Sequence, residues 1–433
     1  MAITLHKNAA DFESRFTALL STKREVAQDL NLTVAEIIAD VRARGDAAIV
    51  DYTRRFDRHD VTPTTLAFSP AEVDAAMAQV APEVIAALEL AYERIEAYHR
   101  RQLPADDRFT DAAGVEMGHR WTAVEAVGMY VPGGTAAYPS SVLMNAVPAK
   151  VAGVERLVMV VPTPDGQVMP AVLAAARIAG IHEIYRIGGA QAVAALAYGS
   201  ETIRPVAKIV GPGNAYVAAA KRQVFGTVGI DMIAGPSEVL VLADGANDPA
   251  WIAADLLAQA EHDASAQSIL ITDDEDFAAA VETEVHRQAA LLPRASIAQA
   301  SWRDFGAIII VPTLEDGLPL VDRLAPEHLE IAAENADGLA ERVRNAGAIF
   351  IGRYTPEAVG DYVGGPNHVL PTARSARFSS GLNVLDFMKR TSILKCSADA
   401  LGAIGRQAIT LGRAEGLEAH ARSVAIRLNL LHD

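Results

Sequence analysis

Cysteine is almost absent from this sequence: Cys396 is the only one among 433 residues. A single thiol cannot form an intramolecular disulfide, and it cannot supply a zinc site built from several thiolates. No second cysteine flanks Cys396, and its histidine neighbours are distant in the sequence. We therefore interpret it as a packing residue.

Positive charge and long apolar runs are also scarce. Lys and Arg number 38 against 54 Asp and Glu, which gives a formal net charge of −16. This balance argues against general binding to nucleic acid or to an anionic membrane, because both require a cationic face. No run of about 18 apolar residues occurs, and residues 1–8 lack the apolar region of a signal peptide. We expect a cytoplasmic protein without nucleic-acid or membrane partners.

The chain reads as helical from residue 9 to about 110, and a different pattern begins near residue 124. From there, short apolar runs alternate with Ala-rich stretches of helical spacing. This alternation is typical of a parallel sheet covered by helices on both faces. The predicted strands are 124–131, 156–161, 184–187, 208–210, 239–242, 268–272, 307–311, 329–332 and 348–351. The predicted fold class is α/β.

This pattern predicts two doubly wound αβα domains between two helical regions. Residues 1–115 form an N-terminal helical arm and packing layer, and residues 381–433 form a C-terminal helical tail. The αβα domains span residues 116–240 and 241–380, with exchange of segments between them left open. They are incomplete Rossmann-like domains, because no G-x-G-x-x-G follows a predicted strand. Residues 354–383, rich in Gly, Pro, Asn and Ser, predict a long functional loop.

Three other glycine-bearing turns follow predicted strands. They cover residues 130–135, 188–191 and 211–214. Open α/β sheets bind ligands at the carboxyl ends of their strands, and glycine there lets a backbone amide approach a phosphate. Each turn alone is explained as a tight turn required by the sheet. Together, on neighbouring strands, they favour a nucleotide crevice.

Candidate metal ligands are scattered along the chain. Gln259 and His262 are three residues apart on a predicted helix, so they share a face and offer an amide oxygen and an imidazole to a divalent cation. On these residues alone, a polar helix end is the simpler explanation of this pair. Asp361 is either a hard oxygen ligand or a turn residue. Glu415 and His420 are either donors or part of the solvated face of a terminal helix.

Glu327 and His328 are the candidates for acid–base chemistry. Pro326 disfavours helix at Ala325, so we expect the preceding helix to end there and a strand to begin near Leu329. Adjacent residues of an extended segment point to opposite sides, which would allow distinct roles. A histidine with an ordinary pKa near 6.5 accepts a proton at neutral pH. The alternative is a solvated junction between helix and strand.

Taken together, these segments resemble the histidinol dehydrogenase family from one end of the chain to the other. The strings that carry the resemblance are Gly-Pro-Gly-Asn at 211–214, Ala-Gly-Pro-Ser-Glu at 234–238, Gln-Ala-Glu-His at 259–262, Ala-Pro-Glu-His-Leu at 325–329, Gly-Asp-Tyr at 360–362, Asn-His-Val-Leu-Pro at 367–371 and Glu-Gly-Leu-Glu-Ala-His at 415–420. The resemblance implies a zinc-dependent homodimer that oxidises L-histidinol to L-histidine through histidinaldehyde with two NAD⁺, the last steps of histidine biosynthesis.

The resemblance also implies that the αβα domain of residues 116–240 is of NAD type, and it implies a role for each candidate. The zinc ligands would be Gln259, His262, Asp361 and His420, with His420 supplied by the partner subunit's tail. Glu327 and His328 would be the catalytic pair. Substrate contacts would come from Ser237, Gln259, His262, His328, Asp361, Glu415 and His420. NAD contacts would come from Tyr130, Gln191 and Asn214.

The chemistry of these residues agrees with this interpretation. Zinc would orient the substrate through its imidazole and amine, and His328 would remove the hydroxyl proton. Glu327 would activate the water that hydrates the aldehyde, because Cys396 carries no motif of a thiol nucleophile. Two alternatives stay open: a zinc hydrolase in which Glu327 drives a metal-bound water, and a member of the same family that oxidises another amino alcohol or diol. The glycine turns favour a dehydrogenase, since a hydrolase needs no dinucleotide crevice.

Overall fold

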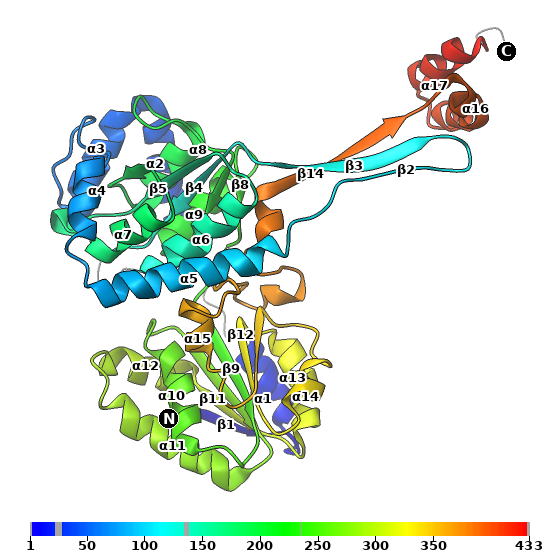
Figure 1. Cartoon of the computed structure of the whole chain (residues 1–433). Coiled ribbons are helices and arrows are strands. Elements are labelled where there is room, and N and C mark those ends of the chain that lie inside the picture. Colours follow the sequence, from blue (N-terminus) through cyan, green and yellow to red (C-terminus); the bar gives the residue numbers. More distant parts are fainter. Residues whose placement is uncertain (1, 22–27, 134–137, 234, 431–433) are drawn as a thin grey trace. The chain divides into compact units, whose positions relative to one another are not determined.

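The computed structural model describes residues 2–21, 28–133, 138–233 and 235–430 (Figure 1). The chain divides into two compact units. The larger unit contains Met1–Gln102 and Glu125–Phe387, and the smaller unit contains Leu103–Val124 and Met388–Asp433. Among the helices within these described ranges, none is long and apolar enough to cross a membrane. The boundaries proposed at residues 115, 240 and 380 remain a prediction.

A five-stranded parallel sheet forms one half of the larger unit. Its strands, in the order β6-β5-β4-β7-β8, are Glu183–Tyr185, Arg156–Val160, Ala126–Tyr130, Lys208–Val210 and Gly229–Ile230. The helices that follow β4, β5, β6 and β7 are α6 (Pro139–Val151), α7 (Pro170–Ile178, after the 3₁₀ turn η1, Pro164–Gly166), α8 (Gly189–Tyr198) and α9 (Ala215–Val224). All five residues of β4 are buried, as expected for a central parallel strand covered on both faces. The predicted α/β class is confirmed.

Helices from the N-terminal region pack on this sheet. They are α2 (Gln28–Arg44), α3 (Asp46–Asp57), α4 (Pro70–Met77) and α5 (Pro82–Arg100). Val34, Ile38 and Ile49 join a buried core with Ala-rich α8 and with α9. The apolar spacing read from the sequence therefore marks the faces that α2 and α3 bury.

A six-stranded sheet, also parallel throughout, forms the other half of the larger unit. In the order β1-β11-β10-β9-β12-β13, its strands are Ile3–His6, Ala307–Ile310, Gln267–Thr272, Glu238–Ala243, His328–Ala332 and Ala348–Ile351. Its helices are α1 (Phe12–Ser21), α10 (Pro249–Ala260), α11 (Glu275–Ala289), α12 (Ala295–Phe305), α13 (Leu314–Leu324), α14 (Ala336–Ala340) and α15 (Glu357–Tyr362).

Alternate residues of its central strand β9 enter two different cores. Leu240 and Leu242 pack with residues of α1, α13 and α14, whereas Val239 and Val241 pack with residues of α10, α11 and α12 (Figure 1). The period-two alternation of a strand thus divides the helices between the two faces. This is the doubly wound arrangement predicted from the sequence.

Strand β1 corrects the expectation that the N-terminal region is a purely helical arm. Ile3 pairs with Ala307, so the first residues of the chain add an edge strand to the six-stranded sheet. Only Leu5 of the strand is buried. Such a short pattern with one buried position gives no periodicity to read, and the partner strand lies far along the sequence.

The smaller unit is built differently from the prediction. Its antiparallel sheet has the order β14-β3-β2, with strands Met388–Lys395, Glu116–Ala123 and Asp107–Thr110. Residues 116–123, expected in the first αβα domain, therefore pair with residues 388–395, expected in a helical tail. The helices expected between residues 398 and 430 are present as α16 (Ala398–Ala414) and α17 (Glu418–Ala425), followed by η4 (Ile426–Leu428).

Cys396 lies between β14 and α16 and is exposed, so its interpretation as a packing residue is wrong. Helices α16 and α17 pack together but bury few side chains. Ile409, Ala421 and Ala425 form their shared core, with partly buried apolar neighbours. A core this small cannot bury all of the neighbouring apolar side chains, and the Cys396 thiol stays at the surface.

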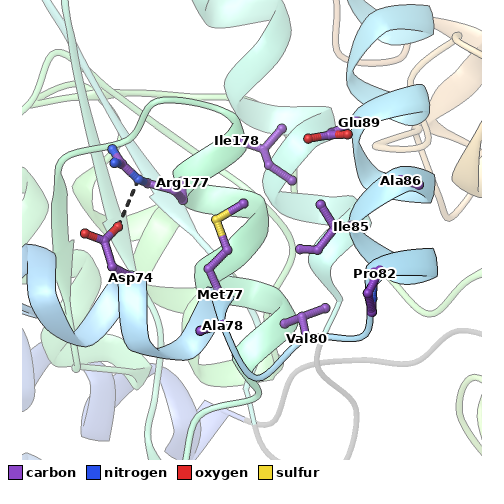
Figure 2. A pocket seen from close by; sticks show the side chains of 10 residues that line it. All are labelled: Asp74, Met77, Ala78, Val80, Pro82, Ile85, Ala86, Glu89, Arg177 and Ile178. Carbon is purple, nitrogen blue, oxygen red and sulfur yellow. Dashed lines mark ion pairs between the residues drawn. The ribbon is translucent and has the colours of Figure 1, made fainter.

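Helices α4, α5 and α7 line a surface groove (Figure 2). Arg177 and Asp74 form an ion pair at its edge, with Nε and Oδ1 3.1 Å apart. The remaining lining is largely apolar, including Met77, Ile85 and Ile178. None of the site residues predicted from the sequence lies among the residues that line this groove, so it is not the candidate site.

A buried ion pair fixes the turn after β7. The side chains of Lys221 and Asp231 are 3% and 1% exposed and contact each other directly. Lys221 Nζ donates to Gly211 O at 3.0 Å, and Gly211 N donates to Asp231 Oδ2 at 2.8 Å. Gly211 has φ +107°, and a Cβ there would collide with Tyr130 O. The pair therefore holds both backbone groups of a glycine that no other residue could replace without strain.

We predict that Asp231→Asn lowers the free energy of unfolding by about 3–5 kcal/mol, because it leaves the Lys221 charge buried without a counter-charge. Urea denaturation of the unmodified protein and of Asp231→Asn measures this difference in the free energy of unfolding. Asp304→Asn, which breaks the exposed pair with Arg303, is the matched control and should change stability little. Equal effects of the two substitutions would contradict the prediction.

Candidate active site

The catalytic pair predicted from the sequence lies where β12 begins, beside the start of β9. Helix α13 ends at Leu324, as expected from Pro326, and Ala325 takes a left-handed conformation with φ 47°. Glu238 N donates to Glu327 Oε2 at 2.9 Å. The Glu238 carbonyl lies 3.1 Å from His328 Nδ1. The first residue of β9 therefore holds both side chains through its backbone.

The expectation that Glu327 and His328 act on opposite sides of the strand is wrong for their functional groups. Glu327 Oε2 lies 3.8 Å from His328 Nδ1, and both side chains are buried. Regular alternation starts only at His328, the first residue of β12, so Glu327 is free to turn toward its neighbour. The solvated-junction alternative is excluded by the burial of both groups.

Gln259 reaches the same edge of the sheet from α10, whereas His262 lies in the turn that follows the end of this helix at Ala260. The expectation that both residues lie on the helix is therefore wrong for His262, because the chain leaves the helix through a turn in which His262 N donates to Gln259 O at 3.1 Å. This helix connects the parallel strands β9 and β10, so it runs back and ends at their amino ends. Gln259 is 1% exposed, and neither atom of its amide has a hydrogen-bond partner among the described residues. His262 stacks against Tyr138 with ring planes 1° apart. A buried amide left unpaired is costly unless something else binds it.

Asp361 lies on the short helix α15, within the segment predicted to be a long loop. That expectation is wrong for Glu357–Tyr362, because helix-forming residues sit inside a stretch whose overall composition is typical of a loop. The ligand atoms of His262, Glu357 and Asp361 all lie within 4.8 Å of one another. Asp361 Oδ1 is also 3.6 Å from His328 Nε2. Helix α15 thus joins the metal-ligand candidates to the catalytic histidine.

Glu357 is a site residue that sequence reasoning missed. Its carboxylate Oε2 lies 3.9 Å from His328 Nδ1, and its side chain is 2% exposed. Its backbone N–H donates to Glu330 Oε1 at 2.5 Å. An acidic residue four positions before Asp361 was the available signal, since this spacing places both on one helical face. The loop assignment concealed it.

The site contains more buried acidic groups than basic groups. Burial raises the pKa of Glu327 to about 7 and that of Glu357 to about 8. Burial also raises the pKa values of Asp255 and Glu330, which share a hydrogen bond behind Glu357. Carboxyl groups crowded in this way resist ionisation unless a cation compensates them.

The histidines respond in opposite directions. Burial opposes a positive charge on His328, but the carboxylates of Glu357 and Glu327 outweigh it and raise the pKa of His328. Burial lowers the pKa of His262, which favours the neutral imidazole that a metal ion requires. Burial also opposes ionisation of Asp361, yet its contact with His328 lowers the pKa of Asp361. The two histidines are therefore adapted to different tasks.

A second layer of contacts holds the backbone at Asp361. His368 Nδ1 donates to Asp361 O at 2.9 Å, and His368 Nε2 lies 3.3 Å from Ser141 Oγ. Asn367 Nδ2 donates to Met144 O at 2.6 Å. The Asn-His string that carried no assigned role thus ties α15 to helix α6 of the five-stranded sheet.

Ser237, predicted to contact substrate, directly precedes β9 and so lies at the same edge as Glu327. The loop beside it is fastened by two contacts: Thr372 Oγ1 accepts from Gly235 N at 2.5 Å, and Glu238 Oε1 accepts from Ala373 N at 3.1 Å. Residue 234 lies outside the described residues.

The three cofactor candidates lie at the carboxyl edge of the five-stranded sheet. Tyr130 ends β4, and its hydroxyl accepts from Gly189 N at 3.0 Å. Gln191 lies in the first turn of α8 and is 1% exposed. Asn214 caps α9, with Oδ1 accepting from two backbone N–H groups. Residues 134–137 of the first glycine turn lie outside the described residues.

Glu415 and His420 belong to the smaller unit. Glu415 caps the C-terminus of α16, and His420 lies on α17; both are exposed. The larger unit therefore brings together Glu327, His328, His262, Asp361 and the unpredicted Glu357, while Glu415 and His420 belong to the other compact unit.

A two-sheet α/β protein with glycine turns at one strand edge and a buried histidine–carboxylate cluster at another has the features of an enzyme that combines a nucleotide cofactor with acid–base chemistry. The family model for histidinol dehydrogenase matches residues 20–428. The chain belongs to the histidinol dehydrogenase family. Members of this family are NAD-dependent oxidoreductases of histidine biosynthesis, so the predicted enzyme class is confirmed and the hydrolase alternative is excluded.

Individual relatives agree over the whole length of the chain. It is 69% identical over 430 residues to histidinol dehydrogenase of Rhizobium meliloti (strain 1021), covering 99% of each chain. It is 68% identical to the enzyme of Mesorhizobium japonicum, covering 99% of this chain and 100% of the relative. A crystal structure of histidinol dehydrogenase from Elizabethkingia anophelis has a TM-score of 0.94 and 36% identity, covering 100% of this chain and 99% of that one.

Proposed function

We propose that this protein oxidises L-histidinol to L-histidine through histidinaldehyde, with two NAD⁺ and one zinc ion per site. The observation that carries this proposal is the convergence of His328 with Asp361, 3.6 Å away, and with Glu327, 3.8 Å away, at one buried edge. An alcohol oxidation needs a base at the hydroxyl, and an aldehyde oxidation needs an activated water. The pair supplies one group for each.

The donor set fits a zinc ion. Proposed ligands are Gln259, His262 and Asp361 of one chain and His420 of the partner subunit, a nitrogen and oxygen set that zinc accepts. The unpaired amide of Gln259 and the 4.8 Å cluster around His262 support this choice. Glu357 is either an additional ligand or a compensating charge. Zinc would supply a fixed positive charge and a template for the imidazole and amine of histidinol.

His328 is the proposed base for both oxidations. The Glu238 carbonyl can only accept, so His328 Nδ1 carries the hydrogen and Nε2 is left as the proton acceptor. A cation held by the adjacent ligand cluster would offset the carboxylates that raise the pKa of His328 and would bring this pKa back toward neutrality. Nε2 then takes the hydroxyl proton of histidinol, and later that of the hydrated aldehyde.

Glu327 is the proposed base for hydration. Its pKa of about 7 lets it take a proton from water and release it again near neutral pH. Glu238 N holds one carboxylate oxygen, which fixes the orientation of the group. Tyr130, Gln191 and Asn214 would hold NAD⁺, which supplies the hydride acceptor for each oxidation. Ser237 and Glu415 are proposed to contact the substrate.

We expect the purified protein to contain about one zinc per chain, and chelation to abolish NAD⁺ reduction with histidinol. Glu357→Gln should weaken zinc binding about tenfold or more, because it removes a carboxylate from the cluster. Elemental analysis and competition with a chromogenic chelator measure this. Glu334→Gln removes an exposed carboxylate two residues after the end of β12, outside the cluster, and serves as the control. Full activity of metal-free protein would refute the proposed metal role.

We expect His328→Asn to slow both half-reactions by about 10²–10⁴-fold, since both need its proton acceptor. Glu327→Gln should mainly slow histidinaldehyde oxidation, because only that step needs activated water. Single-turnover assays starting from histidinol and from histidinaldehyde separate the two effects, with zinc content as control. If Glu327→Gln oxidises the aldehyde at the original rate, its role in hydration is wrong.

The smaller unit favours a homodimer. It exposes large apolar side chains, including Leu394, Leu411 and Ile426 at 69%, 63% and 54%. Every residue of β2 is exposed, and β14 is exposed along most of its length. Apolar surface of this kind is characteristic of a contact with another chain. A second copy would cover it and supply His420 and Glu415.

Mixed dimers test this arrangement. A His420→Asn chain paired with an Asp361→Asn chain should regain about half of the activity of the unmodified dimer, because one of its two sites receives both intact residues. Differently tagged chains, purified as the heterodimer, allow the measurement. A His262→Asn and Asp361→Asn pair is the control and should regain none. Absence of recovery in the first pair would argue for a site within one chain.

A further inference from the structure

One buried carboxylate near the cofactor candidates takes no part in the chemistry above. Asp57 is the last residue of α3 and is 7% exposed. Its Oδ2 accepts from Thr163 N at 3.2 Å. Among the hydrogen bonds between described residues, none reaches its Oδ1. A buried carboxylate with an oxygen still available is suited to accept a hydrogen bond from a ligand.

The topology identifies what this position would contact. With β4 as the first strand, the order β6-β5-β4-β7-β8 corresponds to 3-2-1-4-5, the order of a dinucleotide-binding half-domain. In such domains an acidic residue after the second strand accepts a hydrogen bond from the 2′-hydroxyl of the adenosine ribose. The second strand here is β5, which ends at Val160 and continues through Pro162 to Thr163.

No acidic residue occupies the chain immediately after β5. The next one, Asp165, is exposed and is paired with Arg58. Asp57 instead brings a carboxylate to Thr163 from a different element, the helix α3. A carboxylate thus lies beside the end of the second strand although the usual sequence fingerprint is missing.

The surroundings of Asp57 agree with this position. Burial, together with the Asp57 carboxylate, raises the pKa of Tyr130 to about 12, so the phenol keeps its proton. Tyr130 in turn contacts the turn before α8 through Gly189 N. The nearby basic side chains have partners: Arg58 binds Asp165, and His59 Nδ1 lies 2.9 Å from Thr163 Oγ1. No unpaired arginine is present among these neighbours to receive a phosphate.

We propose that Asp57 recognises the adenosine ribose of NAD⁺ through its 2′-hydroxyl and is the residue that discriminates against NADP⁺. The hydroxyl donates to the carboxylate, whereas the 2′-phosphate of NADP⁺ offers no donor and brings a charge of about −2 beside it. This inference rests on the proposed binding of the dinucleotide at the edge formed by Tyr130, Gln191 and Asn214.

Asp57→Asn tests the proposal, because the amide oxygen still accepts from Thr163 N while the charge is lost. Binding of NADH and NADPH is titrated by the fluorescence of the reduced nicotinamide, without turnover. We expect weaker NADH binding and a fall of about tenfold or more in the preference for NADH over NADPH. Asp165→Asn, which removes an exposed charge near the same turn, is the matched control and should keep the preference.

Two outcomes overturn the proposal: an unchanged preference in Asp57→Asn, or an equal fall in Asp165→Asn. A further measurement needs no variant and therefore does not depend on correct folding. The unmodified protein should bind adenosine-2′-deoxy-NAD⁺ several-fold more weakly than NAD⁺, and equal affinity would refute the proposal.

Gln191→Leu separates this inference from the proposed function. If Gln191→Leu weakens both dinucleotides while Asp57→Asn changes nothing, only the role of Asp57 fails. If neither substitution affects binding of either dinucleotide, the proposed cofactor edge itself fails.

Discussion

Buried negative charge is the constraint on which the active site depends. Glu327, Glu357 and Asp361 surround His328 in a region with little access to water, and their pKa shifts reflect the cost of placing carboxylates there. Such a cluster is stable only if protons or a cation neutralise it. The adjacent neutral imidazole of His262 and the unpaired amide of Gln259 are the groups expected where a divalent cation completes the balance. Neutralisation of these carboxylates is thus needed both for the stability of the site and for its chemistry.

The two sheets of the larger unit offer different edges for different tasks. The cofactor candidates lie at the carboxyl ends of β4, β6 and β7, beside glycine turns and the N-termini of α8 and α9. The acid–base cluster lies at the amino ends of β9 and β12, reached by the returning end of α10. The segment around His368 connects these halves, because it binds α6 through Ser141 and holds Asp361 by its backbone. Positioning of the site therefore involves both sheets.

Local pattern predicted much of this arrangement. The alternation of apolar runs with helical stretches indicated the parallel sheets, and Pro326 indicated the end of α13. The spacing of Gln259 and His262 predicted one helix for both, and this holds for Gln259 but not for His262, because α10 ends at Ala260. Three features were not predicted, because the residues next to them in the sequence did not indicate them. Glu357 lay in a stretch with the composition of a loop, β1 showed a single buried position, and the exposure of Cys396 follows from a small core that no neighbouring residue reveals.

The amino-acid sequence by itself determined the class of fold, the family and the identities of the candidate catalytic and metal-binding residues, because periodicity and short motifs are properties of neighbouring residues. Tertiary structure alone decided which of them meet. Ile3 finds Ala307, Glu238 holds Glu327 and His328, and Asp57 reaches Thr163 only because strand pairing and burial join segments far apart in the chain. Those contacts depend on the packing of the whole unit, which no local pattern encodes.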